Sequence, residues 1–186
     1  MTLTVKERAE YMGVFRWVEA FLMETLAGWV PTTPEMEIKV LFGRHVWEAA
    51  QNADALGKRS FELRAPLHYT LKPLPEMAGW LETLRQLEPT GDRIACYYDA
   101  VLPAMEERYR QYLQSTDHLL DEPSVRVIER ILDGYARQQH ERRQYCSELA
   151  QPPEPAQSAT TDWIEQGAPS AEFVPHGAEG MLARAS

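Results

Sequence analysis

Apolar residues recur along most of this chain every three or four positions, which is the period of an amphipathic α-helix. The pattern predicts four long helices, over about residues 5–29, 35–59, 93–115 and 124–149. Alternation with a period of two, which marks a half-buried strand, is almost absent. The sequence therefore predicts an all-α protein. Pro103 lies inside the third segment, so we expect that helix either to begin near Pro103 or to kink there.

The lengths of the connections predict how these helices are arranged. A few residues join the first helix to the second and the third to the fourth, so each pair should form an antiparallel hairpin. Between the second and third helices lies a connector of about 33 residues, from 60 to 92, which contains four prolines and a helix-like part at 76–87. A connector of this length can cross the whole bundle, which would make the two middle helices parallel. The predicted order of connections is therefore short, long, short.

Polar residues form a seam along the second helix, where core positions are expected. At about 100° per residue, five side chains fall within roughly 80° of one another: Glu37, Leu41, His45, Glu48 and Asn52. Polar groups beside apolar ones on a bundle helix are costly unless they are paired or bound to a metal. This seam is therefore the first candidate for a functional site.

Composition and charge argue against several classes of function. The chain of 186 residues has a formal net charge of −9 and a pI of about 5.1, whereas binding to nucleic acid or to an anionic membrane needs clustered Lys and Arg. No stretch approaches the ~18 apolar residues of a membrane span, and the first residues do not read as a secretion signal. We therefore expect a cytoplasmic protein with two reduced thiols, Cys96 and Cys146.

The composition changes after residue 150. Residues 151–186 are rich in Pro, Ala, Ser and Gly and show no sustained period, which is typical of a disordered or loosely docked tail. Alternatively, three apolar side chains would anchor this segment across the bundle or onto a partner chain: Trp163, Ile164 and Phe173. The sequence thus divides into a helical bundle over 1–150 and a C-terminal tail over 151–186.

Acidic and imidazole side chains on the predicted helices favour a metal site. In carboxylate-bridged dinuclear bundles each helix sends ligands into the centre, as single glutamates or as Glu-x-x-His units whose members share a face. Positions 45 and 48 have this spacing in the reverse order. Iron suits such a set of oxygen and nitrogen ligands, with manganese as the second choice. The candidate ligands are Glu19, His45, Glu48, Glu106 and Glu129, with Asp133 and His140 as further candidates on the fourth helix.

The helix order, the long middle crossover and the segment FGRHVWEAAQNADAL at residues 42–56 resemble the ferritin-like superfamily. The resemblance covers about residues 5–150. It implies a four-helix bundle with a metal site at Glu19, Glu48, Glu106 and the fourth helix. Members of the superfamily include di-iron oxidases and oxygenases, iron stores, and proteins that have lost the metal.

This chain departs from the superfamily's ligand pattern at two places. A Glu48-x-x-His unit needs histidine where this chain has Gln51, and Leu132 lies three residues after Glu129, where a second histidine is expected. Two classes of function therefore stay open. The first is an oxidoreductase in which bound metal activates dioxygen against a small organic substrate, with His45 and Glu48 as the catalytic residues.

The second class is a metal-free bundle that binds a small molecule or a partner chain, including a homodimer through helix faces. Four seam residues would then form a satisfied polar network or recognise a ligand by hydrogen bonds: Glu37, His45, Glu48 and Asn52. The same pocket could instead run acid–base chemistry, with His45 titrating near neutrality and Glu48 orienting it. Tyr109 and Tyr135 are either core residues with a polar handle or part of the pocket lining.

Overall fold

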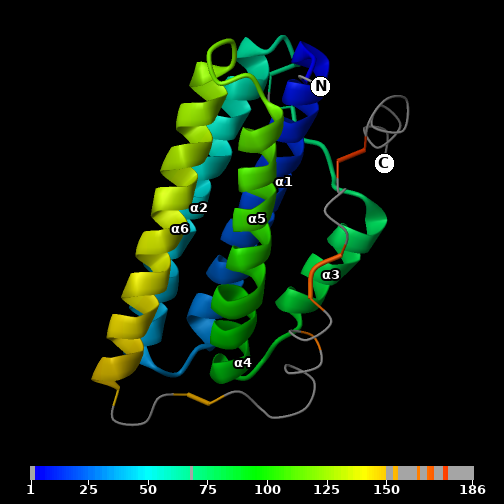
Figure 1. Ribbon diagram of the computed structural model, residues 1–186. Coiled ribbons are helices and arrows are strands. Elements are labelled where there is room, and N and C mark those ends of the chain that lie inside the picture. Colours follow the sequence, from blue (N-terminus) through cyan, green and yellow to red (C-terminus); the bar gives the residue numbers. More distant parts are fainter. Residues whose placement is uncertain are drawn as a thin grey trace.

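The chain folds into helices joined by short turns and one long connection (Figure 1). The computed structural model describes residues 3–67, 69–149, 153–154, 163, 167–169 and 174–175. These residues contain no β-strand, so the predicted all-α class is confirmed. None of the described helices combines the length and the apolar character needed to cross a bilayer. The elements are α1 (Val5–Trp29), η1 (Val30–Thr32), α2 (Met36–Glu62), α3 (Pro75–Arg85), α4 (Thr90–Ile94), η2 (Ala95–Val101), α5 (Leu102–Ser115) and α6 (Glu122–Glu148).

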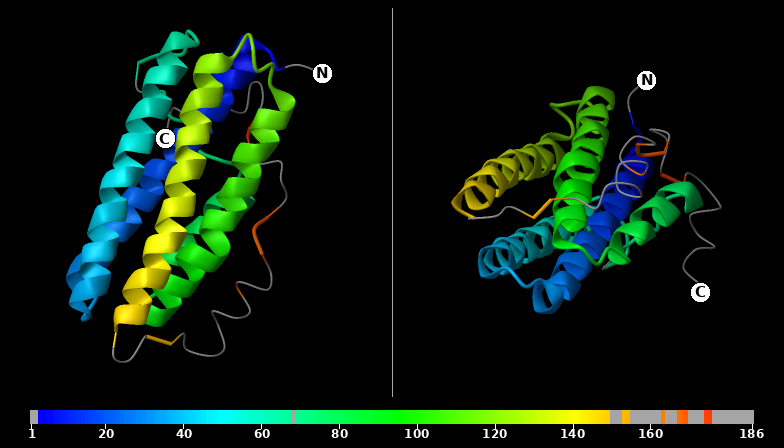
Figure 2. Two further views of the ribbon diagram at one scale, coloured as in Figure 1. Left: turned by 60° about the vertical axis from the view of Figure 1, so that its left-hand side comes forward. Right: turned by 90° about the horizontal axis from the view of Figure 1, so that it is seen from below.

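The long helices lie side by side in the order that the connection lengths predicted (Figure 1). The short element η1 joins α1 to α2, and a short loop joins α5 to α6, so each pair is antiparallel. The long connection carries α3 and returns the chain to the opposite end of the bundle, which makes α2 and α5 parallel. Figure 2 shows α3 beside α1, on the side away from α2.

Local sequence signals explain where several helices begin. The Thr4 side chain accepts a hydrogen bond from the backbone N–H of Glu7, and the Glu7 carboxylate accepts one from the backbone of Thr4, which is a capping box at the start of α1. Pro75 and Pro123 lie in the first turns of α3 and α6, where a missing N–H costs no hydrogen bond. The predicted bounds of α1, α2 and α6 agree closely with the structure.

The third predicted helix begins at Thr90 and contains a wide π-helical segment just before Pro103. Proline has no N–H to donate, and its ring clashes with the carbonyl four residues earlier, so a regular helix cannot continue through it. The segment η2 ends immediately before the turn that holds Pro103. Two consecutive side chains of η2, Tyr97 and Tyr98, are both buried. Such π-helical turns frequently occur at functional positions.

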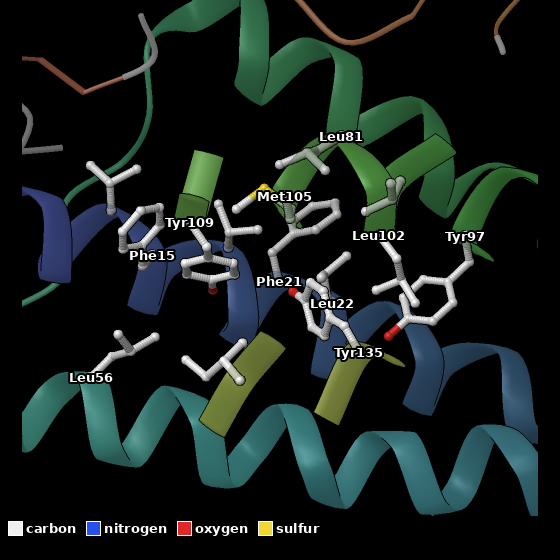
Figure 3. Close-up of a cluster of buried hydrophobic side chains, with 14 of the residues drawn as sticks. Phe15, Phe21, Leu22, Leu56, Leu81, Tyr97, Leu102, Met105, Tyr109 and Tyr135 are labelled. Atoms are coloured by element: carbon white, nitrogen blue, oxygen red, sulfur yellow. The ribbon is translucent and has the colours of Figure 1, made fainter. Parts of the chain in front are cut away.

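Aromatic and aliphatic side chains from the long helices fill the space between them (Figure 3). Phe15 of α1 packs on Tyr109 of α5 with ring centroids 4.4 Å apart, and Tyr109 packs on Tyr135 of α6 at 5.9 Å. Leu81 of α3 reaches the same cluster. Pairs of buried rings each contribute about 0.5–1.5 kcal/mol beyond their buried area. The core is therefore continuous across the hairpins and the crossover.

Part of the C-terminal tail packs on α3 and α5. The indole of Trp163 stacks on that of Trp80, with ring centroids 4.5 Å apart and planes inclined by 4°. Arg108 donates a hydrogen bond from Nη2 to the carbonyl oxygen of Pro169 at 2.6 Å. These contacts support the anchored alternative for Trp163. The two other predicted anchors lie outside the described residues: Ile164 and Phe173.

A buried aspartate fastens the end of the bundle where α5 turns into α6. Its carboxylate accepts hydrogen bonds from Tyr112 at 2.5 Å, Thr116 at 2.8 Å, Ser124 at 2.6 Å and Arg59 at 3.0 Å. Burial alone raises the pKa of Asp121, but these four donors outweigh it, so the pKa lies below its ordinary value. Asp121 therefore links α2, α5 and α6 as a charged group.

We expect Asp121→Ala to lower the free energy of unfolding at neutral pH by about 3–5 kcal/mol, because the Arg59 guanidinium would lose its buried partner. The loss should shrink in acid, since a carboxyl with a lowered pKa stabilises the fold above its ordinary pKa and stops doing so as the pH falls through the folded value. Urea unfolding at pH 7 and pH 3 measures both effects. The control is Asp133→Ala at an exposed position on α6, which should change stability by less than about 0.5 kcal/mol. Equal effects of the two variants at pH 7 would contradict the role of Asp121.

Candidate functional site

The polar seam of α2 faces the bundle interior and meets polar side chains from the other long helices. His45 and Asn52 are buried and Glu48 is half-buried, whereas Glu37, at the start of α2, is exposed and does not join them. The interior polar side chains form three neighbouring hydrogen-bonded groups, centred on Glu19, Glu48 and His45, and we call them together the central polar network. Its members are Glu19, His45, Glu48, Asn52, Tyr97, Tyr98, Tyr109, Tyr135, Gln138 and Glu141.

Glu19 of α1 lies at the centre of this network, and only 1% of its surface is exposed. Its Oε1 atom accepts hydrogen bonds from the hydroxyls of Tyr109 at 2.8 Å and Tyr135 at 2.7 Å. Its Oε2 atom accepts one from Nδ2 of Asn52 at 3.2 Å. The predicted ligand Glu19 and the predicted pocket residues Asn52, Tyr109 and Tyr135 are thus brought together, but as partners of one another.

The environment of Glu19 favours its neutral form. Burial raises the pKa of this carboxyl, and the nearby Glu48 raises it further. The three hydrogen bonds from Tyr135, Tyr109 and Asn52 lower the pKa but do not overcome the burial. The three side chains that donate to it are all uncharged. Glu19 is therefore a buried acid held by neutral donors.

Glu48 accepts hydrogen bonds from α6 at the edge of the interior. Arg137 donates to Oε1 from Nη2 at 2.9 Å and from Nε at 3.2 Å, and Nε2 of Gln138 donates to Oε2 at 2.9 Å. The other end of the Gln138 amide accepts a hydrogen bond from the hydroxyl of Tyr97 at 3.0 Å. Glu48 is therefore connected through one amide to a tyrosine of the π-helical segment.

His45 joins a second tyrosine of that segment to an acid on α6. Its Nδ1 lies 2.7 Å from the Tyr98 hydroxyl and its Nε2 lies 3.2 Å from a carboxylate oxygen of Glu141. The other Glu141 oxygen accepts a hydrogen bond from Arg44 at 2.7 Å. A carboxylate can only accept, so we assign the ring proton to Nε2, and Nδ1 then accepts from the Tyr98 hydroxyl.

The sequence predicted that His45 titrates near neutrality, but its surroundings in the structure lower the pKa of the imidazole. Burial lowers the pKa of His45 to about 4, with Arg44 and Arg137 acting in the same direction and Glu48 opposing them. The expected orienting residue was Glu48, but the ring is held by Glu141 instead. Sequence reasoning missed Glu141 although a signal existed. The buried stripe of α6 continues in steps of three from Tyr135 to Gln138 and Glu141.

The remaining candidate ligands do not reach the network. Glu106 forms an ion pair with Arg110 one turn along α5, and its side chain is 41% exposed. Glu129, like Asp133 and His140, is exposed on the outer side of α6. On α6, Tyr135 donates to Glu19, while Gln138, three residues later, and Arg137 donate to Glu48. Across the part of the chain that the structure describes, no three His, Cys, Asp or Glu side chains form a group that could hold a metal ion.

The donor set therefore does not fit a dinuclear metal centre. Each interior acid is already bonded to protein donors, and the two positions that would complete the ligand set carry a phenol and an amide. Comparisons with protein-family models, with curated proteins and with solved structures found no match for this chain.

The raised pKa of Glu19 predicts how a neutral substitute behaves. A carboxyl with a raised pKa stabilises the fold below its ordinary pKa, and this contribution disappears as the pH rises through the folded value. Glu19→Gln keeps an acceptor for both tyrosines, so we expect it to be more stable than the wild type at pH 7 and similar near pH 4. Glu19→Ala should lose about 3 kcal/mol near pH 4, because it leaves a cavity and unpaired hydroxyls, and less at pH 7, where the wild type has itself lost part of this contribution. Urea unfolding tests this; a Gln variant that is much less stable than the wild type at pH 7 would contradict it.

A second prediction concerns the protonation of His45. We expect the imidazole to stay neutral from pH 8 to pH 5 and to take up a proton only near pH 4. Because the folded pKa is lowered, stability is complete above the ordinary pKa near 6.5 and falls by about 3 kcal/mol as the pH drops toward 4. NMR titration of the ring signals, assigned with a His45→Asn variant, measures this directly. Half-protonation near pH 6.5 would show that His45 is not held as described.

Proposed function

We propose that this chain is a ferritin-like four-helix bundle whose centre is a protein hydrogen-bond network, and that it works by binding a partner chain. The short, long, short order of connections and the parallel α2 and α5 support the ferritin-like assignment. The first ligand position of such bundles corresponds to Glu19 on α1 and the second to Glu48 on α2.

One observation carries the metal-free part of the proposal. The acids at these two positions are bonded to Tyr109, Tyr135 and Asn52 on one side and to Arg137 and Gln138 on the other. A ligating carboxylate needs free lone pairs that point at a common centre, together with further ligands from the facing helices. The facing helices supply hydrogen-bond donors at these places. The network therefore works as a complete unit without an ion.

The burial of the network argues against catalysis at the centre. A general acid or base has to come within hydrogen-bond reach of its substrate. Glu19 is 1% exposed and His45 is fully buried, and each is in contact with other side chains of the chain. In contrast, the outer side of α2 exposes Trp47 to solvent with 66% of its surface accessible. Tryptophan is enriched among residues that dominate protein interfaces. Binding at the surface is thus the better supported activity.

That the protein is a metal-dependent oxidase is still a prediction, and the metal content of the purified protein tests it. We expect the full chain, purified without chelator, to contain well under one iron or manganese per chain by elemental analysis, and to remain so after anaerobic reconstitution with ferrous iron and desalting. Glu48→Ala should leave this result unchanged, because Glu48 is bound to α6 side chains. About two irons per chain in the wild type, lost in Glu48→Ala, would overturn the proposal and support the oxidase.

A further inference from the structure

The outer side of α2 carries an aligned set of large apolar side chains that are exposed to solvent. They are Met36 at 65%, Val40 at 47%, Trp47 at 66% and Phe61 at 55% of their accessible surface. At about 100° per residue these four lie within roughly 60° of one another and extend over about 37 Å of helix. Single exposed apolar residues are common, whereas an aligned set marks an interaction surface. We call this set the α2 stripe.

The surface beside Trp47 is hollow and open to close approach. A depression of about 470 Å³ has a mixed lining of apolar, polar and charged side chains: Trp47, Ala50, Gln51, Asp54, Ala55, Lys58 and Arg130. One turn before Trp47, a Cβ atom added at Gly43 would meet nothing within 4 Å. No contact inside the chain therefore requires glycine there, although glycine is unfavourable in a helix interior. A glycine on an exposed helix face lets a second backbone come near.

We infer that the α2 stripe binds a second copy of this chain, with the two α2 helices antiparallel about a two-fold axis near residue 49. The inference rests on the proposed partner-binding function and identifies the partner. In this arrangement Trp47 of each copy lies over the hollow of the other, which is bounded by Ala50 and Asp54. A tryptophan buried near the centre of an interface is the kind of contact that dominates interface energies.

The distribution of charge and size along α2 selects a second copy as the occupant. Arg44 lies five residues before position 49 and Asp54 lies five residues after it, while Met36 and Phe61 lie near the two ends of the stripe. An antiparallel pair therefore places Arg44 opposite the partner's Asp54 on both sides of the axis, and Met36 opposite the partner's Phe61. A parallel pair would place like charges together. Such self-matching is what a two-fold symmetric interface requires.

The two charged groups are available for this contact. Arg44 contacts Glu141 through Nη2 at 2.7 Å and the Tyr145 hydroxyl through Nη1 at 3.4 Å, but its side chain is 51% exposed and the guanidinium carries five N–H donors, more than these two contacts use. Asp54 is 63% exposed and pairs with Lys58 on the same helix. Exposed ion pairs contribute little energy by themselves, but opposite charges at matched positions set the orientation of two partners.

The size of the stripe predicts a weak dimer. A helix face about 37 Å long and roughly 10 Å wide covers on the order of 400 Å² on each copy. This is about half of the area per partner in a stable protein interface, and small interfaces of this kind belong to transient complexes. We therefore expect monomer and dimer to exchange, with a dissociation constant in the micromolar range.

Sedimentation velocity of the full chain from about 1 to 500 µM tests the dimer. We expect the weight-average sedimentation coefficient to rise with concentration from that of a monomer toward that of a dimer. Trp47→Glu should weaken the association at least ~100-fold. Asp54→Arg should weaken it ~10-fold, because it places two arginines opposite each other. Both substitutions are at exposed positions, and circular dichroism checks that each variant keeps its helices.

The matched control is Leu119→Glu, because Leu119 is 86% exposed, lies in the loop between α5 and α6, and is not part of the α2 stripe. This variant should associate as the wild type does. A chain that stays monomeric at every concentration overturns the inference, and so does a dimer that Trp47→Glu leaves intact. The same samples are analysed for iron and manganese. A metal-free monomer overturns the dimer alone, whereas stoichiometric metal overturns the proposed function in any oligomeric state.

Discussion

The arrangement of the bundle depends on one buried carboxyl group, that of Glu19. It comes from α1 and contacts donors from α2, α5 and α6, namely Asn52, Tyr109 and Tyr135. A buried donor that loses its partner costs about 1–3 kcal/mol, so a shift of any one helix would be penalised. The apolar side chains around it tolerate many arrangements of similar volume, but this carboxyl is satisfied in one of them. We interpret Glu19 as the group that selects the relative positions of the long helices.

The protein contains a second interior acid whose environment shifts its pKa the opposite way. Glu19 meets only neutral donors and a nearby like charge, and burial raises the pKa of its carboxyl. Asp121 forms ion pairs with Arg59 and Arg8 and accepts from three hydroxyls, and Arg59 and the hydroxyls lower the pKa of its carboxyl in spite of burial. The first acid holds the middle of the bundle with a raised pKa, and the second holds one end with a lowered pKa. The pH dependence of stability therefore contains contributions of both signs.

The helix α2 has an unusual distribution of side chains. A surface helix usually turns its apolar face inward and its polar face to water. Here His45, Asn52 and Glu48 face the interior while Met36, Trp47 and Phe61 face solvent. The inward polar groups are satisfied because the π-helical η2 presents two consecutive tyrosines and α6 presents Gln138 and Glu141. Met36, Trp47 and Phe61 remain exposed on the outer face of α2. This exposed apolar face is the reason that we relate the surface of α2 to the function.

Much of the architecture was determined by the sequence alone. Periodicity of apolar residues placed the long helices, and connection lengths predicted the hairpins, the crossover with its extra helix and the parallel middle pair. These features depend on local patterns and on chain length, so they can be read without contacts. The same reasoning found Glu19, His45, Glu48 and Asn52 as interior polar groups. It also included Glu37, which lies in the exposed first turn of α2.

Only the tertiary structure decided which groups those residues contact. Periodicity places a side chain on a face of its helix, but a hydrogen bond depends on the register and distance of a second helix far away in the sequence. His45 and Glu141 are 96 residues apart, and Glu19 and Tyr135 are 116 apart. The pKa of His45 depends on how completely the other helices bury it, and the role of Tyr135 and Gln138 depends on their facing two acids from α1 and α2. For that reason the sequence alone could indicate a polar centre, whereas the folded chain was needed to show that its acids are paired with tyrosines, amides and arginines.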